Sequence, residues 1–308
     1  MTESSSRAAE AGAGDGAGVS RGWKPTPESK RKATTFRWIA AALWAVAIIA
    51  EGIAIFWLLR QREFSGKEGT LVRDPDTGLL EERGVTATFP QWAFITLLVL
   101  LVVIAALSIT GSVLWKKANR LDPASRSDTV RFFVQNQLGA IIAIIAFLPL
   151  IILIFLNKDM DKGQKATAGI VGIVLAAVAA FIGIDFDPAS VEEYTADQSA
   201  VIQLLGEDEV TWVAGGGVYH VCDQVPDIQT GSEILYGTTA EAVEAGKTRL
   251  TLEFASELNA CGRPVPENAD EIVTALRQIR DGQATTLPAP VWAAGDEAPI
   301  EIEDAPAE

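Results

Sequence analysis

The sequence predicts a membrane all-α fold, a four-helix transmembrane bundle, followed by a small α+β soluble C-terminal domain. Three observations predict it: four long apolar runs within residues 36–185, tryptophans at the ends of those runs, and a polar, strongly acidic remainder after residue 185. A bilayer core of about 30 Å needs about 20 apolar residues in helical form. Buried helices of soluble proteins rarely supply four such runs in succession, so we expect the lipid bilayer to be the partner of this region.

The four runs have the length and the flanks of membrane spans. They cover approximately residues 38–59, 92–114, 138–156 and 166–184. Tryptophan side chains favour the interface between lipid and water. Four of them lie near the span ends, at positions Trp38, Trp57, Trp92 and Trp115. Pro90 comes directly before the second run, where a helix start tolerates its missing N–H.

The basic residues give a modest orientation signal. Eleven Lys and Arg residues precede the first span or lie between the second and third, against eight in the other two connections. Loops rich in Lys and Arg stay in the cytoplasm. Because four spans return the chain to the side on which it started, we expect both termini to be cytoplasmic.

Glu51 is the ionisable residue that lies within a predicted span. A charge at that depth costs about 2.5–3.5 kcal/mol on insertion scales, so it is a candidate functional residue. Two interpretations remain open: a shallow, protonated or hydrogen-bonded side chain, and a site for proton or ion handling. The other three spans contain no acid, histidine or lysine that would form a relay with it, which argues against a pump.

The fourth span carries a row of small residues. Gly172, Ala176 and Ala180 are spaced four apart, so they share one helix face. Small residues at this spacing allow two helix backbones to approach closely. The row therefore predicts either packing inside the bundle or pairing with another membrane protein subunit.

The soluble part reads as one small domain between two disordered segments. Residues 1–35 are rich in Ser, Ala and Gly, and residues 281–308 are rich in Ala, Pro and acids, so we expect both to be disordered. Between them, residues 190–280 form the domain. Capping patterns and periodicity predict its elements. These are helices over 191–205, 239–246 and 268–280, a hairpin of 211–214 with 218–221 around three glycines, and a strand over 249–254.

His220, Cys222 and Cys261 form the one group in the domain with metal or redox chemistry. His220 and Cys222 are two residues apart, so on a strand both face the same way. Together with Cys261 they would offer three zinc ligands, with Asp223 or water as a fourth. A Cys222–Cys261 disulfide and two unrelated buried thiols are the alternatives. No nucleophile is paired with a base and an orienting residue, so we do not expect an enzyme.

The charge distribution excludes one class of partner. Residues 185–308 carry five basic and twenty-five acidic side chains, whereas residues 38–184 carry thirteen and eleven. Nucleic-acid binding requires clustered Lys and Arg. We therefore expect no nucleic acid, and we read the acidic third as a solubilising surface.

Several stretches resemble a family of uncharacterised bacterial four-span membrane proteins with a small Tyr-His/Cys C-terminal domain. The stretches are Gly111–Ser125, Phe132–Gly139, Asn157–Lys162 and Asp185–Pro188, within a resemblance that covers approximately residues 36–262. In the tail, Tyr219-His220 and Gly237–Gly246 are similar to a zinc-type module of that family. The cysteines depart from its pattern, because Val225 stands where a cysteine is expected. The resemblance implies the bacterial cell (plasma) membrane and no named activity.

Three functions agree with these patterns. The first is a non-catalytic accessory or scaffold subunit that packs through its fourth span and presents its acidic domain to a partner. The second is a metal- or redox-responsive membrane sensor that uses His220, Cys222 and Cys261. The third is a transporter or proton-handling protein that works through Glu51.

Overall fold

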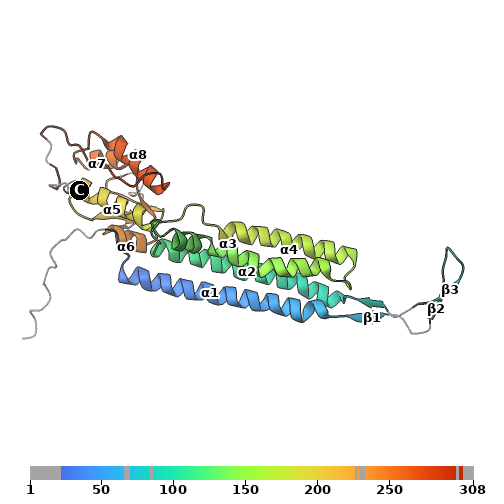
Figure 1. Ribbon diagram of the computed structural model, residues 1–308. Coiled ribbons are helices and arrows are strands. Elements are labelled where there is room, and N and C mark those ends of the chain that lie inside the picture. The colour runs from blue at the N-terminus through green and yellow to red at the C-terminus, as the bar shows by residue number, and fades with distance from the viewer. Residues whose placement is uncertain are drawn as a thin grey trace, which may run out of the picture.

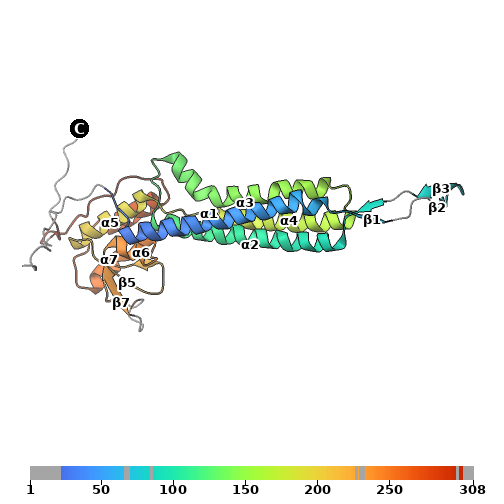
Figure 2. The same cartoon turned by 90° about the horizontal axis from the view of Figure 1, so that it is seen from below.

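The chain forms an elongated molecule with a helical bundle in the middle, a soluble domain at one end and a thin β extension at the other (Figures 1 and 2). The computed structural model describes residues 22–65, 70–83, 86–225, 228, 233–295 and 298–300. Most of the predicted N-terminal arm and the last eight residues of the predicted tail lie outside these residues.

The described elements follow one another along the chain without crossing between the two ends of the molecule except through the bundle. The helices are α1 (Pro27–Phe56), η1 (Leu58–Arg60), α2 (Gln91–Leu121), α3 (Thr129–Leu156), α4 (Lys162–Gly183), α5 (Val191–Leu205), α6 (Thr239–Glu244), α7 (Phe254–Ala260) and α8 (Ala269–Arg280). The strands are β1 (Glu63–Ser65), β2 (Thr70–Arg73), β3 (Leu80–Arg83), β4 (Thr86–Thr88), β5 (Val210–Val213), β6 (Val218–Tyr219), β7 (Ile234–Gly237) and β8 (Arg249–Leu250).

Helices α1 to α4 are each long and apolar enough to cross a membrane. They pack side by side around a core that includes Leu97, Leu101, Phe147, Leu150 and Ile154, all fully buried. Only 28–39% of each apolar window is buried, however. The outer faces therefore present unbroken rows of Ile, Val and Phe side chains, which a water-soluble protein would cover.

The helices extend beyond the predicted spans, mainly at the end nearest the soluble domain. Helix α1 begins at Pro27, within the segment predicted to be disordered, and α3 begins nine residues before the predicted start at Leu138. Thr26 caps α1 by accepting a hydrogen bond from the Ser29 amide. Hydropathy detects only the apolar part of a helix, so polar turns that continue beyond it are missed.

The connection between α1 and α2 carries the β extension, which sequence analysis read as a loop. Strands β1 and β4 pair antiparallel directly beyond the bundle, and β2 and β3 pair antiparallel further out. Figures 1 and 2 show this extension pointing away from the end that holds the soluble domain. The pairing places the extension on the bundle axis.

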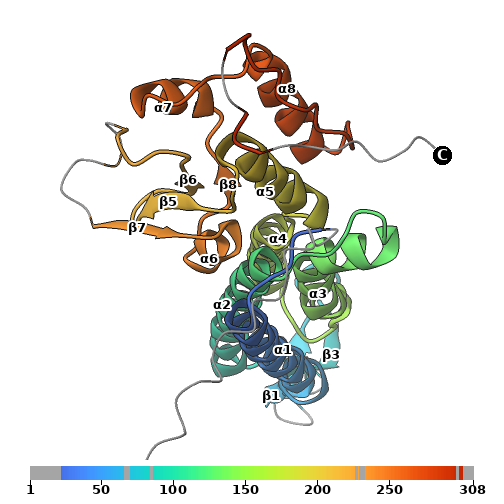
Figure 3. The same cartoon turned by 90° about the vertical axis from the view of Figure 1, so that its left-hand side faces the viewer.

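The soluble domain has α5 at its centre, with two small sheets and α6 to α8 around it (Figure 3). Strands β5 and β7 pair antiparallel, and β6 and β8 pair parallel. An isolated bridge between Thr211 and His220 joins the two sheets. The core includes the fully buried side chains of Tyr219, Leu250 and Phe254.

The predictions for the domain are confirmed for its helices and corrected for its strands. Helix α5 matches 191–205, and α6 and α8 form where the capping patterns placed them. The expected hairpin is reduced to the Thr211–His220 bridge, because β5 takes β7 as its main partner. The predicted strand over 249–254 ends at Leu250, and Phe254 begins α7. Leu250 and Phe254 are both buried, and a spacing of four suits a strand end followed by a helix as well as an alternating strand.

The segment after α8 differs from the expected disordered tail. Residues 281–295 form no helix or strand, but Leu287 and Trp292 pack against the domain core. Asn268 holds the segment further by donating to the Ala289 carbonyl and accepting from the Val291 amide. Composition suggested disorder because Ala, Pro and acids dominate, yet two large apolar side chains are enough to bind the segment to the core.

Candidate functional site at the junction of bundle and domain

The soluble domain is fastened to one end of the bundle by contacts between segments far apart in the sequence. Lys32 on α1 forms an ion pair of 3.0 Å with Glu244 on α6, and Thr26 donates a hydrogen bond of 2.5 Å to the same carboxylate. Trp23 packs edge-on against Tyr194 of α5, with ring centroids 4.7 Å apart. The start of α1 is therefore held by both α5 and α6.

The loop between α2 and α3 forms the second half of this attachment. The Arg126 guanidinium donates hydrogen bonds of 2.6 and 2.5 Å to the carbonyls of Ile279 and Arg280 at the end of α8. Its backbone amide donates to Glu192 at 3.0 Å, and the Ser125 hydroxyl donates to the same carboxylate. Cations are favourable at the carboxyl end of a helix, so Arg126 acts as a cap supplied from another part of the chain.

A buried charge cluster lies behind this junction. Asp197 is completely buried and accepts hydrogen bonds from Tyr219 at 3.1 Å, from the Leu250 amide at 2.8 Å and from Arg280 at 3.0 Å. These donors stabilise the ionised carboxylate. Arg280 also donates to the Leu250 carbonyl at 2.9 Å. The cluster joins α5, β8 and α8 into one unit.

Glu193 is the member of this cluster with the most displaced pKa. It lies one turn before Asp197 on α5, and its carboxylate is 4.0 Å from the Arg280 guanidinium. Burial, followed by the negative charge of Asp197, raises the pKa of Glu193 to about 7. One guanidinium thus faces two carboxylates, and the second of them gains and loses its proton near neutral pH.

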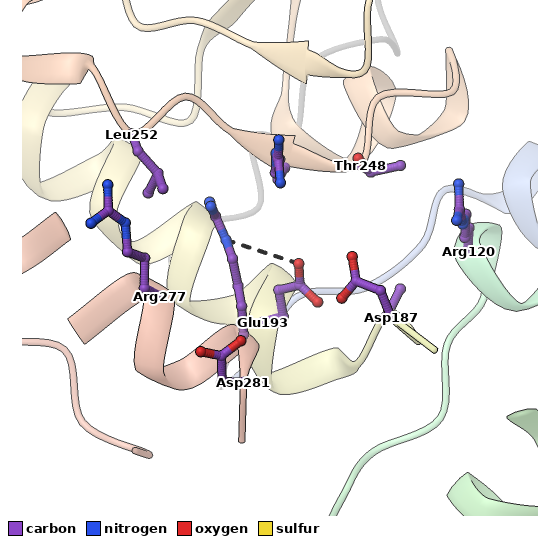
Figure 4. A pocket seen from close by; sticks show the side chains of 10 residues that line it. Arg120, Asp187, Glu193, Thr248, Leu252, Arg277 and Asp281 are labelled. Carbon is purple, nitrogen blue, oxygen red and sulfur yellow. Dashed lines mark ion pairs between the residues drawn. The ribbon is translucent and has the colours of Figure 1, made fainter. Parts of the chain in front are cut away.

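Glu193 lines a pocket of about 260 Å³ between the bundle end and the soluble domain. The walls are charged with both signs and come from α2, α5, the β8 region and α8. They comprise Arg120, Asp187, Ala189, Glu193, Thr248, Arg249, Leu252, Arg277, Arg280 and Asp281. Figure 4 shows the carboxylates of Glu193 and Asp187 side by side, with Arg120 on the bundle side of Asp187. This arrangement suits polar or ionic contacts and contains no paired nucleophile and base within its lining.

The structure brings together only two of the three predicted zinc ligands. Cys222 and Cys261 form a disulfide, with Cα atoms 6.2 Å apart. His220 is set apart from them, because its Nδ1 lies 2.8 Å from the Glu257 carboxylate. Among the described residues, the group with metal-ligand spacing is Cys222, Asp223 and Cys261. In the disulfide form the two sulfurs offer no thiolate, so the His220–Cys222–Cys261 set is not assembled here.

Lys247 is a functional-looking residue that sequence analysis did not single out. It is 2% exposed, and its ammonium donates to the carbonyls of Gly215 and Gly216 at 2.8 and 3.0 Å. Burial lowers its pKa. The three-glycine turn is therefore held by a lysine from 30 residues further along the chain, and Gly216 adopts a positive φ of 75° there. Its role is structural, since the turn carbonyls surround the ammonium.

Glu51 lies inside the bundle and is 5% exposed. Its carboxylate contacts the backbone amide of Leu150, directly after Pro149 in α3, and its Oε1 has no hydrogen-bond partner among the described residues. The side chain thus faces another helix rather than the outer surface. This position agrees with a hydrogen-bonded packing role and leaves the proton-handling hypothesis untested.

The small residues of α4 are used within the bundle. Gly172 faces Ile151 of α3 and Leu101 of α2, and Ala176 and Ala180 pack on the same core. Gly183 approaches α3 so closely that an added Cβ would lie 2.5 Å from the Ala140 backbone nitrogen. The face that was a candidate for pairing with another subunit is therefore occupied by α2 and α3. The outward face of α4 carries larger side chains, including Ile170 and Phe181.

Sequence reasoning missed the junction because its members have no local signature. Arg126 and its α8 acceptors are more than 150 positions apart. One signal was available: Glu193 and Asp197 are spaced four apart after a helix cap, which places two carboxylates on one helix face. Comparisons with known proteins found no matching family model, no matching curated protein and no matching solved structure.

Proposed function

We propose that the protein is a multi-pass membrane protein whose helices α1 to α4 cross a lipid bilayer. The exposed apolar faces support this most directly, since lipid is the solvent that such faces require. The tryptophans support it by their spacing. At 1.5 Å per residue, Trp38 and Trp57 are about 28 Å apart along α1, and Trp92 and Trp115 are about 35 Å apart along α2. These separations match a hydrocarbon layer of about 30 Å.

Extraction tests this location. The full chain should stay with the membrane pellet after washing at high pH and high salt, and should be released only by detergent. Release by either wash without detergent would refute the proposal, because electrostatic attachment at the surface does not survive these washes.

We place the soluble domain and both termini in the cytoplasm of a bacterial cell. The support is the concentration of basic residues where α1, α2 and α3 meet the domain. They comprise Lys24, Lys30, Arg31, Lys32, Arg37, Lys116, Lys117, Arg120, Arg126 and Arg131. Labelling of a cysteine introduced at exposed Ser127, with Cys222 and Cys261 replaced by serine, tests the side. Labelling of intact cells by a membrane-impermeant maleimide would place the domain outside.

In this position we propose a non-catalytic accessory or scaffold role. The observation that carries it is the attachment of the domain through α1, α2 and the 122–128 loop, which fixes its orientation over the membrane. A domain held in one orientation presents the same acidic surface to a partner at all times, without the entropy loss of ordering a linker on binding.

Purification in a mild detergent tests the scaffold role. The wild-type chain should elute with a partner in fixed stoichiometry, and Arg126→Ala, which loosens the domain, should lose that partner. Arg131→Ala is the matched control, since Arg131 lies in the same stretch and is exposed. Elution of the wild-type chain as an isolated monomer would count against the role.

A redox-responsive sensor is the second candidate, and the Cys222–Cys261 pair favours it. Disulfides in the cytoplasm are usually transient and sense or transfer redox equivalents. Cys222 is buried whereas Cys261 is partly exposed, so an attacking thiolate would reach Cys261 first. Thiol trapping in cells should show a reduced pair that oxidises under diamide. A pair that stays oxidised in reducing cytoplasm, or never oxidises, would remove this candidate.

A further inference from the structure

A second pocket lies beside the junction, where α1 and α2 leave the apolar part of the bundle. It has a volume of about 360 Å³ and lies between the ends of α1 and α2 and the α6 region. Figures 1 and 3 show α6 next to the ends of these helices. The volume falls in the range of small-ligand pockets. It is separate from the charged pocket described above, although both include Arg120 and Thr248.

The polar wall of this second pocket is predominantly basic. Lys32, Lys117 and Arg120 line it, with Glu244 as the acid of the lining. Glu244 is already engaged by Lys32 at 3.0 Å and by Thr26 at 2.5 Å. Lys117 and Arg120 are exposed and form no ion pair among the described residues. The pocket therefore has two cations in reach of an incoming anion.

The rest of the wall is apolar. Phe36 from α1, Leu121 from α2 and Val243 from α6 complete the lining. Leu121 and Val243 are buried and Phe36 is partly buried. A cationic rim over an apolar wall matches a ligand with an anionic head and an adjoining apolar part, rather than a free inorganic anion.

The height of the pocket relative to the bilayer points to the same ligand. With Trp38 and Trp115 at the interface, Phe36 and Lys117 lie about 3 Å beyond it along their helices, and Arg120 and Lys32 lie about 7–9 Å beyond it. The headgroup layer on each side of a bilayer is about 5–8 Å thick. The pocket thus lies at the depth of the phosphates of the adjacent leaflet.

We propose that this pocket binds the phosphate-bearing headgroup of an anionic phospholipid, held by Lys117 and Arg120 against the Phe36 wall. Basic pockets between transmembrane helices bind such headgroups. A bound headgroup would contact α1, α2 and the α6 region at once, so it would strengthen the attachment of the soluble domain. This inference rests on the proposed membrane location, which the extraction experiment tests independently.

Native mass spectrometry of the full chain tests the proposal. Protein reconstituted into nanodiscs of phosphatidylglycerol and phosphatidylcholine in equal amounts, then released by detergent, should retain phosphatidylglycerol selectively. Each Lys or Arg near an anionic lipid contributes about 1 kcal/mol, so Lys117→Ala with Arg120→Ala should lower phosphatidylglycerol retention about 30-fold. Lys158→Ala with Lys165→Ala removes the same charge at the other end of the bundle and should leave retention unchanged.

Three outcomes would overturn the proposal. The first is equal retention of both lipids, and the second is an equal loss in both double variants. The third is binding of inorganic phosphate by the lipid-free protein that Lys117→Ala with Arg120→Ala abolishes while lipid retention stays unchanged, which would assign the pocket to a soluble phosphate compound. If the double variant does not fold, Lys117→Gln alone, at an exposed position, should give a loss of about fivefold, and no loss would equally refute the assignment.

Discussion

Glu193 and its neighbour Glu192 should respond to pH in opposite directions. The pKa of Glu193 rises from 4.5 to about 7 on folding. The folded state therefore holds a proton that the unfolded state has released between these values, and the contribution of Glu193 to stability falls as pH rises through this window. A shift of 2.5 units corresponds to about 3 kcal/mol above pH 7, as an upper value.

Glu193→Gln cannot ionise, so it should avoid this loss. The difference in unfolding free energy between Glu193→Gln and wild type should grow from near zero at pH 4.5 to about 2–3 kcal/mol in favour of the variant at pH 8. It falls short of the upper value because Gln gives up the contact with Arg280. The change corresponds to several degrees in melting temperature. The assay is thermal unfolding of the full chain in detergent between pH 4.5 and 8.

Glu192 supplies the control with the opposite sign. Burial opposes its ionisation, but hydrogen bonds from the Arg126 amide and the Ser125 hydroxyl outweigh burial and lower its pKa. Its contribution is present above pH 4.5 and is lost as pH falls through the folded-state pKa. Glu192→Gln should therefore be most destabilising at neutral pH and approach wild type in acid. Parallel pH profiles for the two variants would refute the reasoning.

Three further predictions concern packing and attachment. Arg126→Ala removes two hydrogen bonds from a charged donor to the end of α8 and should cost about 2 kcal/mol of domain attachment, seen as faster amide exchange at that helix end; Arg131→Ala should show no change. Gly183→Ala places a Cβ 2.5 Å from the α3 backbone and should lower the melting temperature in detergent by the equivalent of about 1–3 kcal/mol, whereas Gly52→Ala, with open space around it, should not. Lys247→Met leaves the carbonyls of the glycine turn without their donor and should cost about 1–3 kcal/mol in thermal unfolding; an unchanged melting temperature would show that water replaces the ammonium.

The apolar helices could be predicted from sequence because their signal is local. An apolar run of 19 residues or more has few alternatives, and the tryptophans confirm its ends only approximately. The starts of α1 and α3 could not be read in the same way. The first turns of α1 are polar, and they are held by Glu244 and Tyr194, which lie more than 150 residues later in the chain.

The candidate site could be predicted only in fragments. The sequence offered Cys222, Cys261 and His220 as one group, but a strand spacing of two did not reveal that Glu257 would take the histidine. Arg126 and Arg280 have no neighbours in the sequence that identify their role. Long-range electrostatic contacts leave no periodic pattern, so the junction became visible only once α2, α5 and α8 were placed together.

The joining of the first helix to the soluble domain constrains the order in which the protein can assemble. The Trp23 amide donates to the Thr195 hydroxyl, 172 residues later. At 5–20 residues per second, a ribosome needs on the order of ten to thirty seconds to make the intervening chain. Helix α1 must therefore enter the membrane and wait there with its leading turns uncovered. A nascent chain that stops after α4 has crossed the bilayer but lacks the surface that closes over those turns, which offers quality-control proteases a mark of incomplete synthesis.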